Sequence, residues 1–171
     1  IKIGMLGYGF MGRVHSHAYT VISHLFPELA GIPSLYAVAG LGEDELKQFA
    51  KQFGYVRYSS RWEQVVNDPE VDAVDICLPE HLHEEVCIAA LEAGKHVLCE
   101  KPLALSLAEA QRIVEKAATV NVKTMCGFNY RFLPAVRLAR DLIQQGKLGR
   151  LYMVRGHYCQ ESGHDPNRPA E

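Results

Sequence analysis

The sequence predicts an α/β fold whose centre is a doubly wound parallel sheet. Two observations support this prediction. Apolar strand-like segments alternate with helical segments along almost the whole chain, and helices of ~10–15 residues between strands are typical of βαβ units with a parallel sheet. In addition, the first strand-like segment runs directly into a glycine-rich turn and then a helix. The 171 residues are enough for one such domain and the start of a second.

Each expected element follows from local patterns of apolar and turn-forming residues. These patterns predict strands at residues 1–6, 35–39, 56–58, 71–78, 96–99, 123–126 and 151–157. They predict helices at residues 11–25, 44–53, 62–66, 82–93, 107–120 and 134–145. Ser60 is the expected cap of the helix at 62–66, and Ser106 with Glu109 forms a capping box for the helix at 107–120. Residues 159–166 are expected to form an irregular loop.

The turn after the first strand has the pattern Gly-x-Gly-x-x-Gly at residues 7–12. Gly7 allows a tight turn, Gly9 leaves the backbone open to a pyrophosphate, and Gly12 lets the helix pack closely on the sheet. Phosphates would lie at the helix N-terminus, where free N–H groups and the helix dipole favour anions. The pattern therefore predicts a dinucleotide-binding Rossmann domain; the alternative is a tight glycine turn that holds no ligand.

Ligands of parallel α/β sheets bind beyond the carboxyl ends of the strands. Five stretches follow expected strands in this way, at residues 7–12, 40–43, 79–83, 100–102 and 127–131. These stretches hold the glycine motif and many of the histidine and charged residues that could bind a ligand, so we expect them to form one site.

Composition excludes several other classes of protein. The net charge of −2 gives no reason to expect nucleic acid or an anionic membrane as a partner. No apolar run reaches the ~20 residues that a transmembrane helix needs, and we expect no signal peptide before the first strand. The five cysteines are odd in number and include no Cys-x-x-Cys pair, which favours reduced thiols in a cytoplasmic protein.

We expect no metal site. His15 and His17 are two residues apart on a helix and cannot share a face. They are interpreted as helix residues that pack near the glycine turn. No carboxylate or cysteine stands at a spacing that would complete a ligand set with a histidine.

An ordered set of short motifs resembles one known family. The motifs are Gly7-Tyr8-Gly9-Phe10-Met11-Gly12, His15 with His17, Pro79 with His83, Ala93-Gly94-Lys95-His96-Val97, Glu100-Lys101-Pro102 and Gly127-Phe128-Asn129-Tyr130-Arg131-Phe132. This set resembles the Gfo/Idh/MocA oxidoreductases, which are nicotinamide-dependent sugar and cyclitol dehydrogenases. The resemblance covers nearly the whole chain, and its most specific part is Ala-Gly-Lys-His-Val leading into Glu-Lys-Pro.

The resemblance implies roles for individual residues. Lys101 is the expected catalytic residue, which assists proton loss and stabilises a developing alkoxide; the alternative is an exposed lysine at a strand end. Glu100 is expected to accept hydrogen bonds from the nicotinamide ribose, and the Lys101–Pro102 bond to be cis. Arg131 is weighed equally as a substrate ligand and as an ion-paired arginine at a helix start. The expected cofactor-binding residues are Gly7, Tyr8, Gly9, Phe10, Met11, Gly12, Gly40, Leu78, Pro79, His83, Glu100, Lys101, Pro102, Asn129 and Arg131.

The choice between NAD and NADP depends on the end of the second strand. NAD sites normally carry an Asp or Glu there that binds the ribose hydroxyls, whereas Gly40 occupies that position here. Glu43 and Asp44 follow, but both have the character of acids at a helix start. No Arg or Lys stands there to bind a 2′-phosphate. NAD is favoured over NADP because the nearby side chains are acidic.

The resemblance also implies two domains. Residues 1–127 are expected to form the Rossmann domain, and residues 128–171 the incomplete start of an α/β domain that binds substrate and mediates homo-oligomers. In the resembled family that second domain supplies an Asp and an acid/base His on one helix. We expect this chain alone to lack that His, because no such pair follows residue 128.

The expected function is hydride transfer between a nicotinamide and a secondary alcohol of a sugar or cyclitol. Two alternatives stay open at this point. One is a glycoside hydrolase that oxidises its substrate transiently through NAD, as some relatives do. The other is a regulatory or interaction module that binds a dinucleotide without catalysis.

Overall fold

The computed structural model of the 171-residue chain describes residues 1–159. The chain divides into two compact units, Ile1–Phe128 and Asn129–Glu171. Much of the expected loop at 159–166 lies outside the described residues, as does the end of the expected second domain. Among the helices described, none is both long and apolar enough to cross a membrane.

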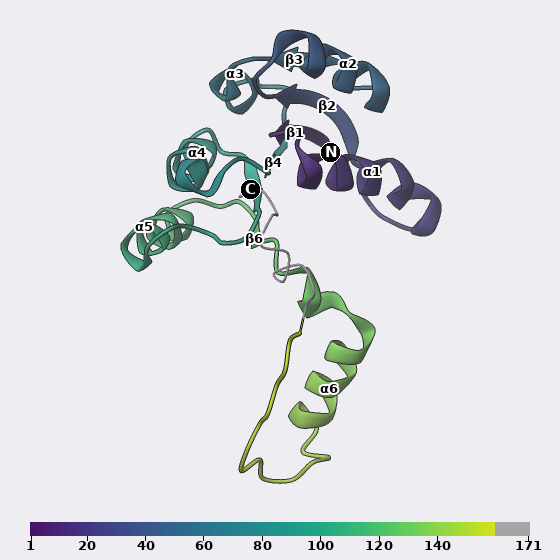
Figure 1. The fold of residues 1–171 in the computed structure, drawn as a ribbon, viewed down its shortest axis with the longest axis vertical. Coiled ribbons are helices and arrows are strands. Elements are labelled where there is room, and N and C mark those ends of the chain that lie inside the picture. Colours follow the sequence, from purple (N-terminus) through teal and green to yellow (C-terminus); the bar gives the residue numbers. More distant parts are fainter. Residues whose placement is uncertain (160–171) are drawn as a thin grey trace. The chain divides into compact units, whose positions relative to one another are not determined.

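The first unit is built around a six-stranded parallel sheet (Figure 1). Its strands are β1 (Lys2–Leu6), β2 (Ser34–Ala39), β3 (Arg57–Ser59), β4 (Ala73–Ile76), β5 (His96–Cys99) and β6 (Thr124–Cys126). The spatial order is β3-β2-β1-β4-β5-β6, and every neighbouring pair is parallel. This order is that of a Rossmann fold, which confirms the fold class predicted from the sequence.

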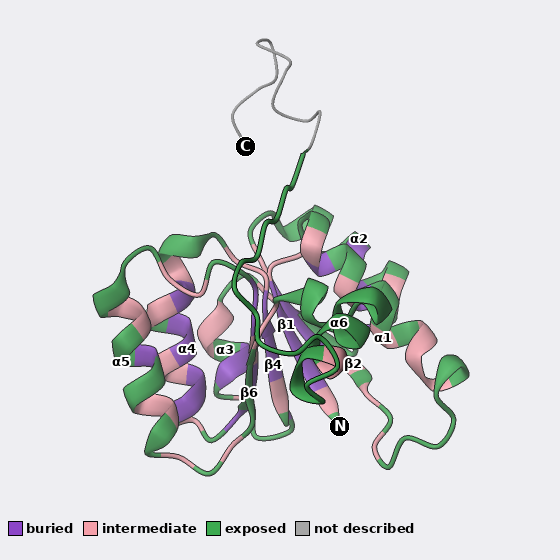
Figure 2. Ribbon diagram, turned by 90° about the horizontal axis from the view of Figure 1, so that it is seen from below, coloured by how far each residue is buried: buried purple, intermediate pink, exposed green. Residues whose placement is uncertain are grey.

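Helices cover both faces of this sheet (Figure 2). The helices of the first unit are α1 (Phe10–Leu25), α2 (Glu43–Phe53), α3 (Trp62–Val66), the 3-10 helix η1 (Glu80–Leu82), α4 (His83–Glu92) and α5 (Leu107–Ala118). Leu6 and Ile76 point into one core, which α3, α4 and α5 cover. Met5 and Val38 point into the other, together with Phe49 of α2. Because neighbouring strand residues face opposite sides, one strand supplies both cores.

Helix ends follow the sequence signals in part. Ser106 Oγ accepts the N–H of Glu109 at 3.3 Å, as expected. The Glu109 carboxylate accepts the N–H of Leu105 instead of that of the cap residue. The predicted cap at Ser60 is wrong: the residue before α3 is Arg61, which makes no side-chain cap. The neighbouring Ser59 hydroxyl accepts the Arg61 N–H at 2.9 Å, so this serine stabilises the turn.

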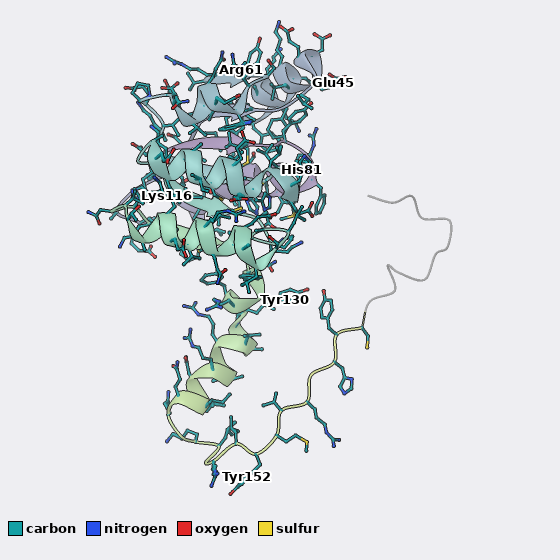
Figure 3. The ribbon with its side chains drawn as sticks, turned by 90° about the vertical axis from the view of Figure 1, so that its left-hand side faces the viewer. Glu45, Arg61, His81, Lys116, Tyr130 and Tyr152 are labelled. Atoms are coloured by element: carbon teal, nitrogen blue, oxygen red, sulfur yellow. The ribbon has the colours of Figure 1, made fainter. Side chains whose placement is uncertain are left out.

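The second unit begins with the 3-10 helix η2 (Asn129–Phe132) and α6 (Pro134–Gln144). The predicted strand at 151–157 is wrong, because these residues form no strand in the part of the chain that the structure describes. A strand requires a neighbouring backbone to accept and donate its hydrogen bonds, and none of the described segments pairs with this one. Its side chains are exposed, Tyr152 among them (Figure 3).

Candidate functional site

The sheet order reverses between β1 and β4, and this switch point is where open α/β sheets bind ligands. A pocket of about 670 Å³ lies beyond the carboxyl ends of β1, β2, β3 and β4. It is lined by Gly7, Tyr8, Gly9, Ala39, Gly40, Leu41, Ser60, Trp62, Cys77, Leu78, Pro79, Glu80, His81 and Leu82. The pocket therefore brings together the stretches that follow four different strands.

The three glycines of the turn have different roles: two are required by the fold, and one leaves space for a ligand. Gly7 has a φ of 95°, and a Cβ there would lie 2.4 Å from the carbonyl oxygen of Cys77. A Cβ on Gly12 would lie 2.2 Å from the carbonyl oxygen of Gly7. A Cβ on Gly9, in contrast, would meet nothing within 4 Å. Gly7 and Gly12 are thus required by the fold itself, whereas Gly9 leaves open space above the turn.

That open space lies at the N-terminus of α1. Gly9 is the residue that precedes the helix, and no side chain caps it. The first N–H groups of a helix have no partner within the helix and favour an anion. Phe10 is exposed and Met11 half-buried at this end. An uncapped helix start beside a glycine with free space fits a pyrophosphate, so the residues present fit a dinucleotide.

Tyr8 shapes the end of β2. A Cβ on Gly40 would lie 2.4 Å from Cδ1 of the Tyr8 ring, so the ring needs a glycine at this position. The Tyr8 hydroxyl donates to the carbonyl oxygen of Leu41. The acids next in the chain, Glu43 and Asp44, lie in the first turn of α2, as their sequence character indicated. The aromatic ring thus takes the place where many sites carry a carboxylate side chain.

His83 joins the segments that follow β4 and β5. Its Nε2 lies 2.9 Å from the carbonyl oxygen of Leu78, and its Nδ1 lies 2.8 Å from that of Pro102. The side chain is buried, at 1% exposure. The peptide bond between Lys101 and Pro102 is cis, as the resemblance implied. His83 therefore contacts the backbone of two predicted cofactor-binding segments.

Glu100 and Lys101 follow β5 at the same edge of the sheet. Glu100 is buried, and its Oε2 accepts the N–H of Lys101 at 3.1 Å. A Cβ on Gly127 would lie 2.6 Å from Glu100 Oε1, so the absence of a side chain at Gly127 makes room for the carboxylate. The Lys101 side chain is exposed. A buried carboxylate thus lies directly before an accessible amine.

His15 lies between two carboxylates. Its Nδ1 is 2.9 Å from Oδ2 of Asp75, and its Nε2 is 3.4 Å from Oε1 of Glu100. The Tyr19 hydroxyl donates to Asp75 at 2.9 Å, and the Cys77 thiol lies 3.5 Å from the same carboxylate. The hydrogen bond to Asp75 is the main cause that raises the pKa of His15, against the opposing effect of burial. Burial raises the pKa of Tyr19 and of Cys77, so both keep their protons.

The expectation that no carboxylate or cysteine joins a histidine is wrong. Ligand-capable atoms of His15, Asp75 and Cys77 lie within 4.8 Å of one another. Sequence spacing missed this because the three residues come from α1, β4 and the residue after β4. Burial raises the pKa of the Cys77 thiol, and this thiol lies 3.5 Å from the Asp75 carboxylate. Hydrogen bonds account for the cluster, and the absence of a metal site stays a prediction.

Two predicted residues lie outside the first unit. Asn129 and Arg131 belong to η2, at the start of the second unit. Their roles at the cofactor and substrate stay predictions, and both interpretations of Arg131 remain open.

Sequence reasoning assigned no role to Asp75, although it carried a signal. A carboxylate within an apolar strand is rarely buried without a partner, and Asp75 is only 1% exposed. Lys95, within the Ala-Gly-Lys-His-Val motif, has a structural role instead. It is also buried, and its ammonium donates to the carbonyl oxygens of Asp68 and Val71 at 2.7 Å each.

Fold and site together define a dinucleotide-binding α/β domain. Residues 1–128 match the family model described as "Oxidoreductase family, NAD-binding Rossmann fold". The chain belongs to this Gfo/Idh/MocA oxidoreductase family.

Relatives in this family include sugar and cyclitol dehydrogenases. The chain is 39% identical over 169 residues to the levoglucosan dehydrogenase of Pseudarthrobacter phenanthrenivorans, covering 99% of this chain and 43% of that protein. It is 31% identical over 155 residues to the myo-inositol 2-dehydrogenase of Thermotoga maritima, covering 91% of this chain and 44% of that protein. The chain thus spans less than half the length of these relatives.

Solved structures give the same result. A crystal structure of an NAD binding oxidoreductase from Klebsiella pneumoniae superposes with a TM-score of 0.84 at 42% identity, covering 87% of this chain and 40% of that one. A levoglucosan dehydrogenase in complex with NADH superposes with a TM-score of 0.85 at 39% identity, covering 88% and 40%.

Proposed function

We propose that this chain forms the cofactor-binding part of an NAD(P)-dependent dehydrogenase that acts on a secondary alcohol of a sugar or cyclitol. The observation that carries the proposal is the free space above Gly9 at the uncapped start of α1, on the same sheet edge as Glu100 and Lys101. The dehydrogenase relatives support the substrate class, because the two named above act on levoglucosan and myo-inositol.

In this proposal the residues at the sheet edge have separate tasks. The free N–H groups at the start of α1, beside Gly9, bind the pyrophosphate. Gly7 and Gly12 keep the turn in shape, and Glu100 accepts hydrogen bonds from the nicotinamide ribose. The accessible ammonium of Lys101 stabilises the alkoxide that forms as the substrate hydroxyl loses its proton. A bound nicotinamide supplies the hydride acceptor. Residues 128–171 form the start of the substrate domain, and the acid/base group comes from outside this chain.

We also propose that NAD is preferred over NADP. The first turn of α2 carries Glu43, Asp44 and Glu45, and the Glu45 carboxylate reaches back toward Gly42, where a Cβ would lie 2.8 Å from its Oε2. These negative charges repel a 2′-phosphate. The relative with a solved NADH complex supports the same preference.

Cofactor titration and turnover test these proposals separately. The chain is titrated with NADH and NADPH, with binding followed by nicotinamide fluorescence. We expect NADH to bind more tightly, and equal or stronger binding of NADPH would contradict the preference. If neither cofactor binds, the proposed function is wrong.

Turnover is then measured in the protein as its organism makes it, with NAD⁺ and levoglucosan or myo-inositol. Reduced nicotinamide should accumulate. Product formation without accumulation would indicate the transient oxidation of a glycoside hydrolase. Binding without turnover of any polyol or glycoside would indicate a binding module.

A further inference from the structure

Both ring nitrogens of His15 face carboxylate oxygens. Nδ1 lies 2.9 Å from Asp75, which is 1% exposed, and Nε2 lies 3.4 Å from Glu100, whose side chain is 9% exposed. His15 belongs to α1, the helix that starts at the glycine turn, whereas Glu100 follows β5. The imidazole therefore connects the phosphate-binding end of the site to the Glu100-Lys101-Pro102 segment.

The neighbours of the two carboxylates determine which groups can donate to them. Asp75 accepts the Tyr19 hydroxyl at 2.9 Å and lies beside the Cys77 thiol, both of which keep their protons. Glu100 uses Oε2 to accept the N–H of Lys101, which leaves Oε1 for His15. Each carboxylate is thus already an acceptor.

A neutral imidazole has a single N–H and could donate to only one of the two carboxylates. Its other nitrogen would then direct a lone pair at a carboxylate oxygen. Only the imidazolium donates on both sides, and it also places one positive charge between two largely buried negative charges. The raised pKa of His15, caused first by the hydrogen bond to Asp75, agrees with this arrangement.

We propose that His15 is a positioning residue: as an imidazolium it fixes the carboxylate of Glu100 for the nicotinamide half of the cofactor. This proposal rests on the proposed function, because it assumes that Glu100 binds the nicotinamide ribose. Loss of the His15 proton removes the donor from Glu100 Oε1 and leaves two carboxylates with one N–H between them. The adenosine half of the cofactor, which lies toward β2 in this fold, is independent of His15.

Two substitutions separate the two contacts of the ring. In His15→Gln the amide nitrogen takes the place of Nε2, so the donor to Glu100 is kept. In His15→Asn the amide nitrogen takes the place of Nδ1, so the donor to Asp75 is kept and that to Glu100 is lost. The full chain and both variants are titrated with NADH and, separately, with ADP, which lacks the nicotinamide riboside.

We expect His15→Asn to weaken NADH binding about tenfold, because it removes the ion pair at 3.4 Å with Glu100, and to leave ADP binding unchanged. His15→Gln should recover most of the NADH affinity. In the unsubstituted chain, NADH affinity should fall as the pH rises through the raised pKa of His15, while ADP affinity should not show this step. The groups that face His15 are Asp75, Glu100, Tyr19 and Cys77.

Equal loss of NADH and ADP affinity in His15→Asn would overturn the proposal, since it would indicate a general disturbance of α1. Unchanged NADH affinity in that variant would overturn it as well. An NMR titration of the His15 ring in the cofactor-free chain tests the charge by itself: a pKa at or below the ordinary value of about 6.5 would contradict the imidazolium. If the unsubstituted chain binds ADP but not NADH, the proposed function fails, and the NMR result still decides the charge of His15.

Discussion

The two ends of the candidate site differ in the groups that they present to a ligand: backbone at the glycine turn, and charged side chains after β5. At the glycine turn the working surface is backbone: Gly9 offers open space, and Gly40 accommodates the ring of Tyr8. At the end of β5 the working surface is charge: Glu100 is buried against His15, with Lys101 exposed beside it. We therefore expect side chains added at the glycine turn to impair cofactor binding, and loss of a charged side chain after β5 to impair the reaction.

The largest expected effect comes from the charged end. Lys101→Met removes the ammonium that we assign to the developing alkoxide, so kcat should fall by about 10²–10⁴-fold, as for other acid–base groups. NADH affinity should change little, because the proposed role is in the reaction. Steady-state kinetics of the organism's own protein with its best polyol substrate measure this.

The matched control for that variant is Lys51→Met, which removes an exposed lysine from α2 and should leave kcat unchanged. If Lys101→Met loses much of its NADH affinity and keeps its kcat, Lys101 binds the cofactor and does not stabilise the alkoxide. That result would contradict the catalytic role that we propose for the charged end of the site.

The glycine turn should respond to added atoms in two distinguishable ways. Gly9→Val has free space in the fold, so its thermal unfolding should match that of the unsubstituted chain. Its NADH affinity should fall about hundredfold, the effect of two lost charge-assisted hydrogen bonds to the pyrophosphate. Gly12→Val, whose Cβ meets the Gly7 carbonyl, should lower the unfolding temperature itself. Calorimetry and NADH titration of both variants check this, and tight NADH binding by Gly9→Val would contradict it.

The smallest of these effects concerns His83, the buried histidine that contacts the segments after β4 and β5. His83→Ala removes a buried ring that contacts two backbone carbonyls, so the free energy of unfolding should fall by about 2 kcal/mol. His81→Ala is the control, because His81 is exposed (Figure 3) and its loss should change that free energy by less than about 0.5 kcal/mol. Urea unfolding measures both. Equal stability of the two variants would show that His83 does not stabilise the strand-end segments.

Local signals predicted most of the fold. The alternation of apolar and helical segments predicted all six strands and the five α-helices of the first unit to within a few residues, but not the 3-10 helix η1. The strands could be recognised because burial on both faces of a parallel sheet produces continuous apolar runs. The failures have local causes. Residues 151–157 have strand-like composition, but composition does not supply a partner strand. The cap at Ser60 failed because Ser59, one residue earlier, accepts the Arg61 N–H.

The candidate site also has features that the sequence predicts and contacts that only the tertiary structure shows. The sequence by itself determined the glycine turn, the missing acid at Gly40 and the Glu100-Lys101-Pro102 segment, because each is a property of adjacent residues. Only the tertiary structure brought His15 to Asp75 and Glu100, and His83 to the carbonyls of Leu78 and Pro102. Apart from the local contact of His83 with Leu78, these contacts join separate βα units, and their geometry depends on how the helices pack against the sheet. A lone histidine or aspartate in the sequence carries no information about which charge it will meet there.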